Sequence, residues 1–152
     1  EASSPIYVEG EKIKGKRVLA IEDGPTLTHG DMGYGAAVIA SKHWGAAEIV
    51  DPRPYAVGTI KGVYEKFKHL NNVLPAMGYS PQQMEELKAT IEATPCDIVV
   101  IGTPVDLSRF LKLSKPSVRI RYELEEKVGS LTELLEPVVK KGIEIRLKPA
   151  LA

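Results

Sequence analysis

Short, uninterrupted apolar runs that alternate with helix-forming segments constrain the fold of this chain more than any other feature. Residues 17–22 and 97–101 form the two clearest runs. Such runs are typical of strands buried on both faces of a parallel sheet. Residues 48–50 and 73–75 are shorter candidates for the same sheet. The sequence therefore predicts a Rossmann-like three-layer α/β sandwich with a mostly parallel sheet.

Helical periodicity and capping residues fill the intervals between these strands. Helices are expected over residues 36–44, near 58–69, from Ser80 onward and near 105–112. A strand is expected over 117–124, a last helix from Ser130 to about Gly142, and an edge strand over 143–147. We interpret residues 1–16 as a linker or the tail of a preceding domain. Residues 17–152 are then one α/β domain that binds a phosphorylated ligand.

The charge balance and cysteine content exclude several classes of function. Lys+Arg and Asp+Glu both total 20, so no global field favours nucleic acid or an anionic membrane as a partner. The single Cys96 excludes an internal disulfide and a cysteine-rich zinc site. We expect a cytoplasmic protein without a metal site, and no catalytic residue can be assigned from the sequence.

A partial P-loop motif lies near the start of the chain. Residues 10–16 match the first seven positions of G-x-x-x-x-G-K-[ST], but the eighth is Arg17. The stretch also precedes the first predicted strand, whereas a P-loop follows a strand and opens a helix. A charged surface turn is the better interpretation, and no nucleotide cofactor is expected within this chain.

The glycine-rich segment after the first strand, residues 23–35, is predicted to be a long loop and is the strongest candidate for a ligand site. Glycines let backbone amides approach an anion, and a helix that starts near residue 35 offers unpaired N–H groups. The alternative is that the glycines only shape the loop. The candidate phosphate-binding residues of this segment are Asp23, Gly24, Thr26, Thr28, His29, Gly30, Gly33 and Gly35.

Two further segments follow predicted strands, where open α/β sheets bind ligands. Arg53 lies between two prolines that restrict its backbone, which suits recognition of a phosphate or carboxylate; a salt bridge to Asp51 or Glu22 is the alternative. Thr103 and Asp106 either cap a helix or help to bind an anion. Arg119 and Arg121 share one face of a strand and are either a solvated stripe or part of the crevice.

Several long strings resemble the C-terminal region of the cyclic 2,3-diphosphoglycerate synthetase family of predicted GTPases and ATPases. These strings are residues 22–30, 48–58, 73–79, 96–104 and 118–124. The resemblance implies an upstream P-loop domain in the same polypeptide and ATP or GTP with Mg²⁺ as its cofactors. It also implies a phosphorylated small-molecule substrate and a parent enzyme that is a ligase or NTPase, of which the isolated chain is inactive.

Two other classes of function remain open at this stage. A dinucleotide-dependent oxidoreductase would need a glycine loop between strand and helix and an acid such as Asp51 after the second strand. The glycines at 30, 33 and 35, however, run in the reverse order of that fingerprint. A non-catalytic assembly domain, including one that forms a homo-oligomer, is the third possibility.

Overall fold

A computed structural model describes residues 1–78 and 80–147, with side chains up to residue 142. The chain separates into two compact units, Ile6–Arg121 and a smaller unit made of Glu1–Pro5 and the chain from Tyr122 onward. The larger unit thus begins before residue 17. Its first turn of 3-10 helix, Gly10–Lys12, is followed by Ile13, whose side chain is fully buried.

A five-stranded sheet forms the centre of the larger unit. Its strands are β3 (Arg17–Asp23), β4 (Glu48–Ile49), β5 (Leu74–Ala76), β6 (Ile98–Ile101) and β7 (Ser117–Arg119). The order is β4-β3-β6-β7, with β5 also paired to β3, and each of these pairings is parallel. This sheet confirms the predicted α/β class, and β3 is its central strand.

Two short strands share one edge of β3. Ile21 pairs with Ile101 of β6 and with Leu74 of β5, so β5 lies on the edge of β3 opposite β6. On that same edge β4 pairs with Arg17 and Val18 at the start of β3. The end of β3, where a ligand site is expected, therefore has β5 and β6 as its neighbours.

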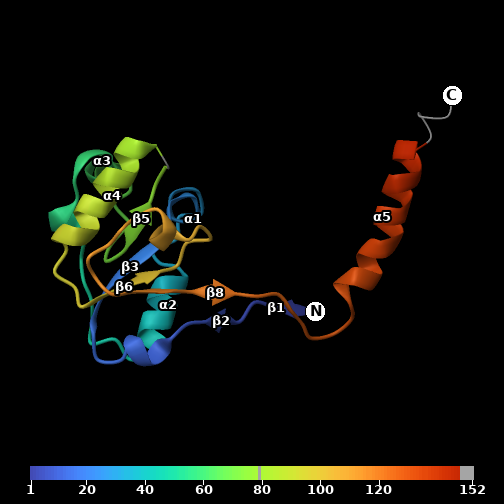
Figure 1. Ribbon diagram of the computed structural model, residues 1–152, viewed down its shortest axis with the longest axis horizontal. Helices are drawn as coiled ribbons and strands as arrows, with labels where there is room; N and C mark the ends of the chain where they lie inside the picture. Colours follow the sequence, from blue (N-terminus) through green and yellow to red (C-terminus); the bar gives the residue numbers. More distant parts are fainter. Residues whose placement is uncertain (79, 148–152) are drawn as a thin grey trace. The chain divides into compact units, whose positions relative to one another are not determined.

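Helices flank this sheet (Figure 1). They are α1 (Gly24–His29), α2 (Ala36–His43), α3 (Gly58–Lys66) and α4 (Pro81–Ala93). The helix α2 leads from β3 to β4, and α4 leads from β5 to β6 in the opposite direction, so right-handed crossovers place them on opposite faces. Leu87 and Ile91 of α4 join the strand residues in one hydrophobic core.

The predicted capping of α4 is confirmed. Ser80 Oγ accepts a hydrogen bond from the Gln83 amide, and the Gln83 side chain accepts one from the Ser80 amide, both at 3.3 Å. This reciprocal capping box satisfies two amides at the start of the helix, where no intrahelical acceptor exists.

Three predicted elements differ in the structure. The helix expected near 105–112 is only a 3-10 turn, Leu107–Arg109, and the strand over 117–124 is divided into β7 and β8 (Arg121–Tyr122). Residues 143–147 are helical instead of an edge strand. They extend α5 (Leu131–Leu147), because continuing a helix adds a hydrogen bond per residue without a new nucleus.

The smaller unit contains α5 and a short antiparallel ladder. The ladder joins β1 (Ala2–Ser3) to β9 (Glu125–Glu126), and β2 (Ile6–Tyr7) belongs to the larger unit. No helix within the described residues has the length and apolar character needed to cross a membrane.

Candidate functional site

A buried carboxylate occupies the carboxyl end of the central strand. Glu22, in β3, has only 2% of its surface exposed. Its Oε1 accepts hydrogen bonds from the amides of Gly35 and Val38, both at 3.0 Å. These amides belong to the start of α2, where unpaired N–H groups and the helix dipole favour an anion. Glu22 therefore supplies the anion for this helix from within the protein.

Two glycines make room for the Glu22 side chain. A Cβ at Gly35 would lie 2.5 Å from Glu22 Oε2, and one at Gly102 would lie 2.7 Å from the same oxygen. Gly35 precedes α2 and Gly102 follows β6, so segments distant in the chain converge on one carboxylate. From this point the chain leads from β3 to β4 in one direction across the sheet, and from β6 to β7 in the other. Such a topological switch point is where open α/β sheets bind ligands.

Burial raises the pKa of the Glu22 carboxyl above its ordinary value. The amides of Val38, Ala37 and Gly35 oppose this shift by stabilising the charged form, and the neighbouring Asp23 carboxylate adds to the shift. A carboxyl group with a raised pKa in such a position is a candidate proton donor or acceptor. Sequence reasoning missed Glu22 as a site residue, although a glutamate inside an otherwise apolar strand is the signal that could have identified it.

The segment after β3 contains a helix, so the prediction of a long loop over residues 23–35 is wrong. Asp23 is the N-cap of α1, and its Oδ2 accepts from the Thr26 amide at 3.2 Å and the Thr26 hydroxyl at 2.6 Å. The Thr28 hydroxyl donates to the Gly24 carbonyl at 3.0 Å. Three of the predicted ligand-binding side chains thus serve α1 itself, because a short helix must satisfy its own terminal groups.

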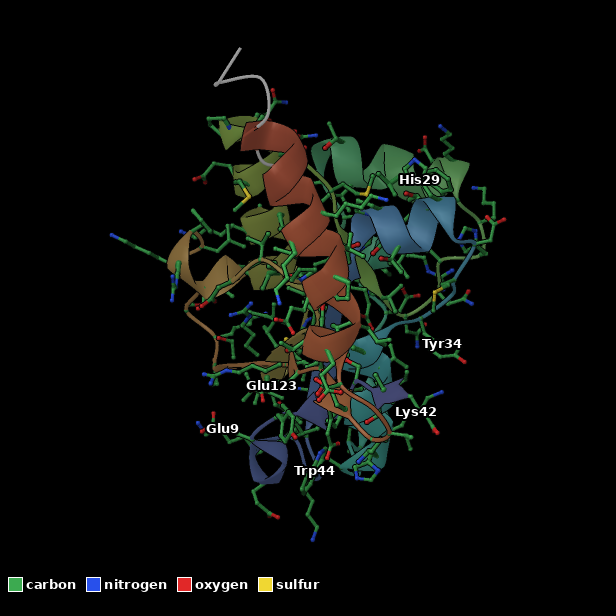
Figure 2. All side chains as sticks on the ribbon, turned by 90° about the vertical axis from the view of Figure 1, so that its right-hand side faces the viewer. Glu9, His29, Tyr34, Lys42, Trp44 and Glu123 are labelled. Atoms are coloured by element: carbon green, nitrogen blue, oxygen red, sulfur yellow. The ribbon has the colours of Figure 1, made fainter. Side chains whose placement is uncertain are left out.

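The remaining residues of this segment lie at its surface or beside Glu22. His29 is exposed at the end of α1, with Nδ1 3.2 Å from the Pro25 carbonyl (Figure 2). The Gly30 amide donates to the Thr26 carbonyl. A Cβ at Gly33 would lie 3.6 Å from the His69 carbonyl, so Gly33 is not tightly enclosed. The sequence predicted that the Gly35 amide binds a phosphate, but this amide donates a hydrogen bond to Glu22 Oε1 instead.

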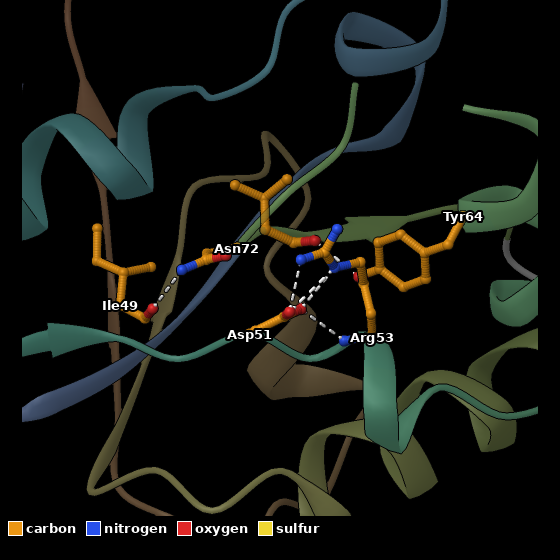
Figure 3. Close-up of polar contacts among 6 residues, drawn as sticks. Ile49, Asp51, Arg53, Tyr64 and Asn72 are labelled. Atoms are coloured by element: carbon orange, nitrogen blue, oxygen red, sulfur yellow. Dashed lines mark hydrogen bonds and ion pairs between the residues drawn. The ribbon is translucent and has the colours of Figure 1, made fainter. Parts of the chain in front are cut away.

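Arg53 forms an ion pair with Asp51 (Figure 3). Its Nη2 lies 2.7 Å from Asp51 Oδ2, and its Nε lies 2.9 and 3.0 Å from the two carboxylate oxygens. These hydrogen bonds lower the pKa of Asp51. The structure therefore adopts the internal salt bridge, one of the two alternatives for Arg53.

The side chain of Arg53 also borders a hollow of about 220 Å³ with Tyr64, Lys61 and Lys68.

Thr103 and Asp106 lie after β6 and are also engaged within the protein. The Thr103 hydroxyl donates to the Val105 carbonyl at 2.6 Å. Asp106 accepts from the Ser108 hydroxyl at 2.6 Å, which is the main cause of its lowered pKa. Its Oδ2 is 3.6 Å from Arg119 Nη1. The structure thus brings Asp106 together with Arg119, a residue that the sequence left without a role.

Within the described residues no group of three His, Cys, Asp or Glu side chains converges as a metal site.

Comparisons with known proteins identify one informative relative. No protein-family model matches the sequence, and no solved structure matches it. The chain is 59% identical over 143 residues to arginine synthetase ArcE of Thermococcus kodakarensis. The aligned region covers 92% of this chain and 32% of ArcE, so the chain spans about a third of the length of that relative.

Proposed function

We propose that this chain is the small-molecule-binding domain of a nucleotide-dependent synthetase that produces arginine. The identity of 59% over 92% of the chain to a protein named arginine synthetase carries this proposal. A synthetase couples bond formation to a nucleoside triphosphate, and the sequence lacks a complete P-loop. We therefore assign the nucleotide and Mg²⁺ to a separate P-loop domain of the parent protein, upstream of this segment.

The carboxyl edge of the sheet, around Glu22, is where the proposed domain binds its ligand. Open parallel sheets bind ligands at this edge because strand ends and helix starts meet there. The backbone amides at the start of α2 are already bound to Glu22, which favours a ligand that interacts with a carboxyl group over a bare phosphate at this point. The guanidinium or amino group of arginine has that chemistry.

Synthesis of cyclic 2,3-diphosphoglycerate is the second candidate function. It is supported by the resemblance of residues 22–30 and 96–104 to that family. Both candidates belong to one coarse class, a nucleotide-dependent enzyme. They differ in the charge of the substrate, which is cationic at the side chain for arginine and strongly anionic for 2,3-diphosphoglycerate.

Titration of the chain with each substrate separates the two candidates. A ligand that binds the folded state raises the unfolding temperature with concentration. We expect arginine to raise it, with the effect reduced in Glu22→Gln, whereas any effect of 2,3-diphosphoglycerate should be the same in Glu22→Gln and in the unaltered chain. Stabilisation by 2,3-diphosphoglycerate that Glu22→Gln reduces, without stabilisation by arginine, would favour the second candidate, and an unfolding temperature that neither compound changes would count against both.

A further inference from the structure

A hollow with two arginines lies beside β7, at one edge of the larger unit's sheet. It has a volume of about 450 Å³ and is lined by Tyr7, Val8, Glu9, Arg119 and Arg121. Small-molecule sites commonly have volumes of about 300–1,000 Å³. Arg119 is the last residue of β7, so the hollow lies at the carboxyl end of an edge strand.

The two arginines face the hollow because of strand alternation. Successive side chains of extended backbone point to opposite sides, so residues 119 and 121 share a side. Ile120 between them is 1% exposed and belongs to the core, whereas Arg121 is exposed. Both arginine side chains therefore line the same hollow.

The hydrogen-bonding capacity of these guanidinium groups is only partly used. Arg119 Nη2 donates to the Pro104 carbonyl at 2.6 Å, but its buried Nε has no partner among the described residues. Arg119 Nη1 lies 3.6 Å from Asp106 Oδ2, so these two groups form an ion pair without a short hydrogen bond. In the described part of the chain Arg121 forms no ion pair.

The acidic groups nearby do not cancel this positive charge. Glu9, which also lines the hollow, is paired with Lys12 Nζ at 2.8 Å. Asp106 is shared between Arg119 and Arg109, the latter at 3.2 Å. The surroundings therefore keep an excess of positive charge, which a dianion neutralises better than a single carboxylate does.

We propose that this hollow binds the phosphoryl group of a small molecule through Arg119 and Arg121. A phosphate monoester carries a charge of about −1.5 to −2 and three acceptor oxygens, which suits two planar guanidinium forks. The exposed ring of Tyr7 forms a wall beside the arginines against which the rest of the ligand packs. This proposal does not depend on arginine synthesis, since it concerns different residues from the Glu22 region.

Inorganic phosphate is the probe that tests the proposal. We expect the chain to bind phosphate, followed by ³¹P NMR and by the Arg Nε–H signals in ¹H–¹⁵N spectra, and to bind acetate much more weakly at equal ionic strength. Arg121→Ala should weaken phosphate binding about tenfold or more, since charge-assisted hydrogen bonds are lost. Arg119→Lys should also weaken it, because lysine keeps the charge but lacks the fork.

Arg17→Ala is the matched control. Arg17 is an exposed arginine at the first position of β3 and is paired with Asp97. Arg17→Ala therefore removes one positive charge, as Arg121→Ala does, without changing a residue that lines the hollow. The affinity of the Arg17→Ala variant for phosphate should equal that of the unaltered chain. The proposal is overturned if phosphate does not bind, if Arg121→Ala and Arg17→Ala have equal effects, or if acetate binds as tightly as phosphate.

Discussion

Glu22 and Gly35 are in closer contact than any side chain at position 35 would permit. The Gly35 amide donates to Glu22 Oε1 at 3.0 Å, and a Cβ on Gly35 would lie 2.5 Å from Oε2. The helix α2 and the strand β3 are joined through this contact, so its integrity determines how well the start of α2 is held.

The first prediction is that Gly35→Ala destabilises the fold by about 2 kcal/mol, because the buried carboxyl must move and its amide bonds weaken. Urea unfolding measures the effect. Gly62→Ala is the control, because Gly62 lies inside α3 and a Cβ there would meet nothing within 4 Å. That change should be neutral or stabilising by up to about 1 kcal/mol. Equal effects of the two substitutions would contradict the close contact.

The second prediction concerns the pH dependence that Glu22 contributes. Its pKa is raised in the folded state, so folding favours the protonated form. Its contribution to stability is therefore fully present below the ordinary carboxyl pKa, and is lost as pH rises through the raised pKa. Glu22→Gln keeps a carbonyl acceptor for the amides, but its side chain does not titrate. The stability of this variant therefore does not fall as pH rises through the raised pKa of Glu22. The difference in unfolding free energy between the two proteins should change in favour of Glu22→Gln from about pH 4 to pH 7.

A difference that stays flat over that range would show that Glu22 titrates normally. The comparison must be made between the two proteins, because Asp51, Asp97 and Asp106 have lowered pKa values. Those groups contribute stability that is lost on acidification, with the opposite sign to Glu22.

The third prediction is that Arg53 has a structural role. Since its guanidinium is bound to Asp51 and both side chains are partly exposed, the coupling in a double-mutant cycle of Arg53→Ala and Asp51→Asn should be about 1 kcal/mol or less. Arg53→Lys should leave the affinity for ligands of the Glu22 region unchanged. A loss of affinity without a loss of stability would restore Arg53 as a ligand-binding residue.

The fourth prediction is that the isolated chain hydrolyses neither ATP nor GTP. The partial P-loop motif forms the 3-10 turn Gly10–Lys12, lies before β3 and does not open an α-helix after a strand. A magnesium-dependent phosphate-release assay with the pure chain tests this. Steady turnover that persists through further purification would contradict it.

The sequence predicted those features that depend on local signals. Apolar runs located β3 and β6, and Ser80 with Gln83 located the start of α4. The same local logic could have located α1, because Asp23 is an N-cap and Pro25 lies in the first turn, but the surrounding glycines suggested a loop.

The candidate site depended on contacts that no local pattern reveals. The Glu22 carboxyl meets Gly35 and Gly102 only once β3, α2 and β6 are assembled. A helix start that looks available for a phosphate in the sequence can be satisfied by a carboxylate from another element. Arg119 and Asp106 are likewise 13 positions apart and come together only through the ends of β6 and β7.

The position of β3 at the centre of the sheet affects how the chain folds as it is synthesised. β3 pairs with β6 through contacts such as Val18 with Ile98, which are 80 positions apart. At a synthesis rate of about 5–20 residues per second, the apolar β3 leaves the ribosome roughly 4–16 seconds before its partner. During that interval β4 and β5 cover only one of its edges. The nascent chain therefore exposes an aggregation-prone strand edge for seconds, and high contact order makes its folding slow.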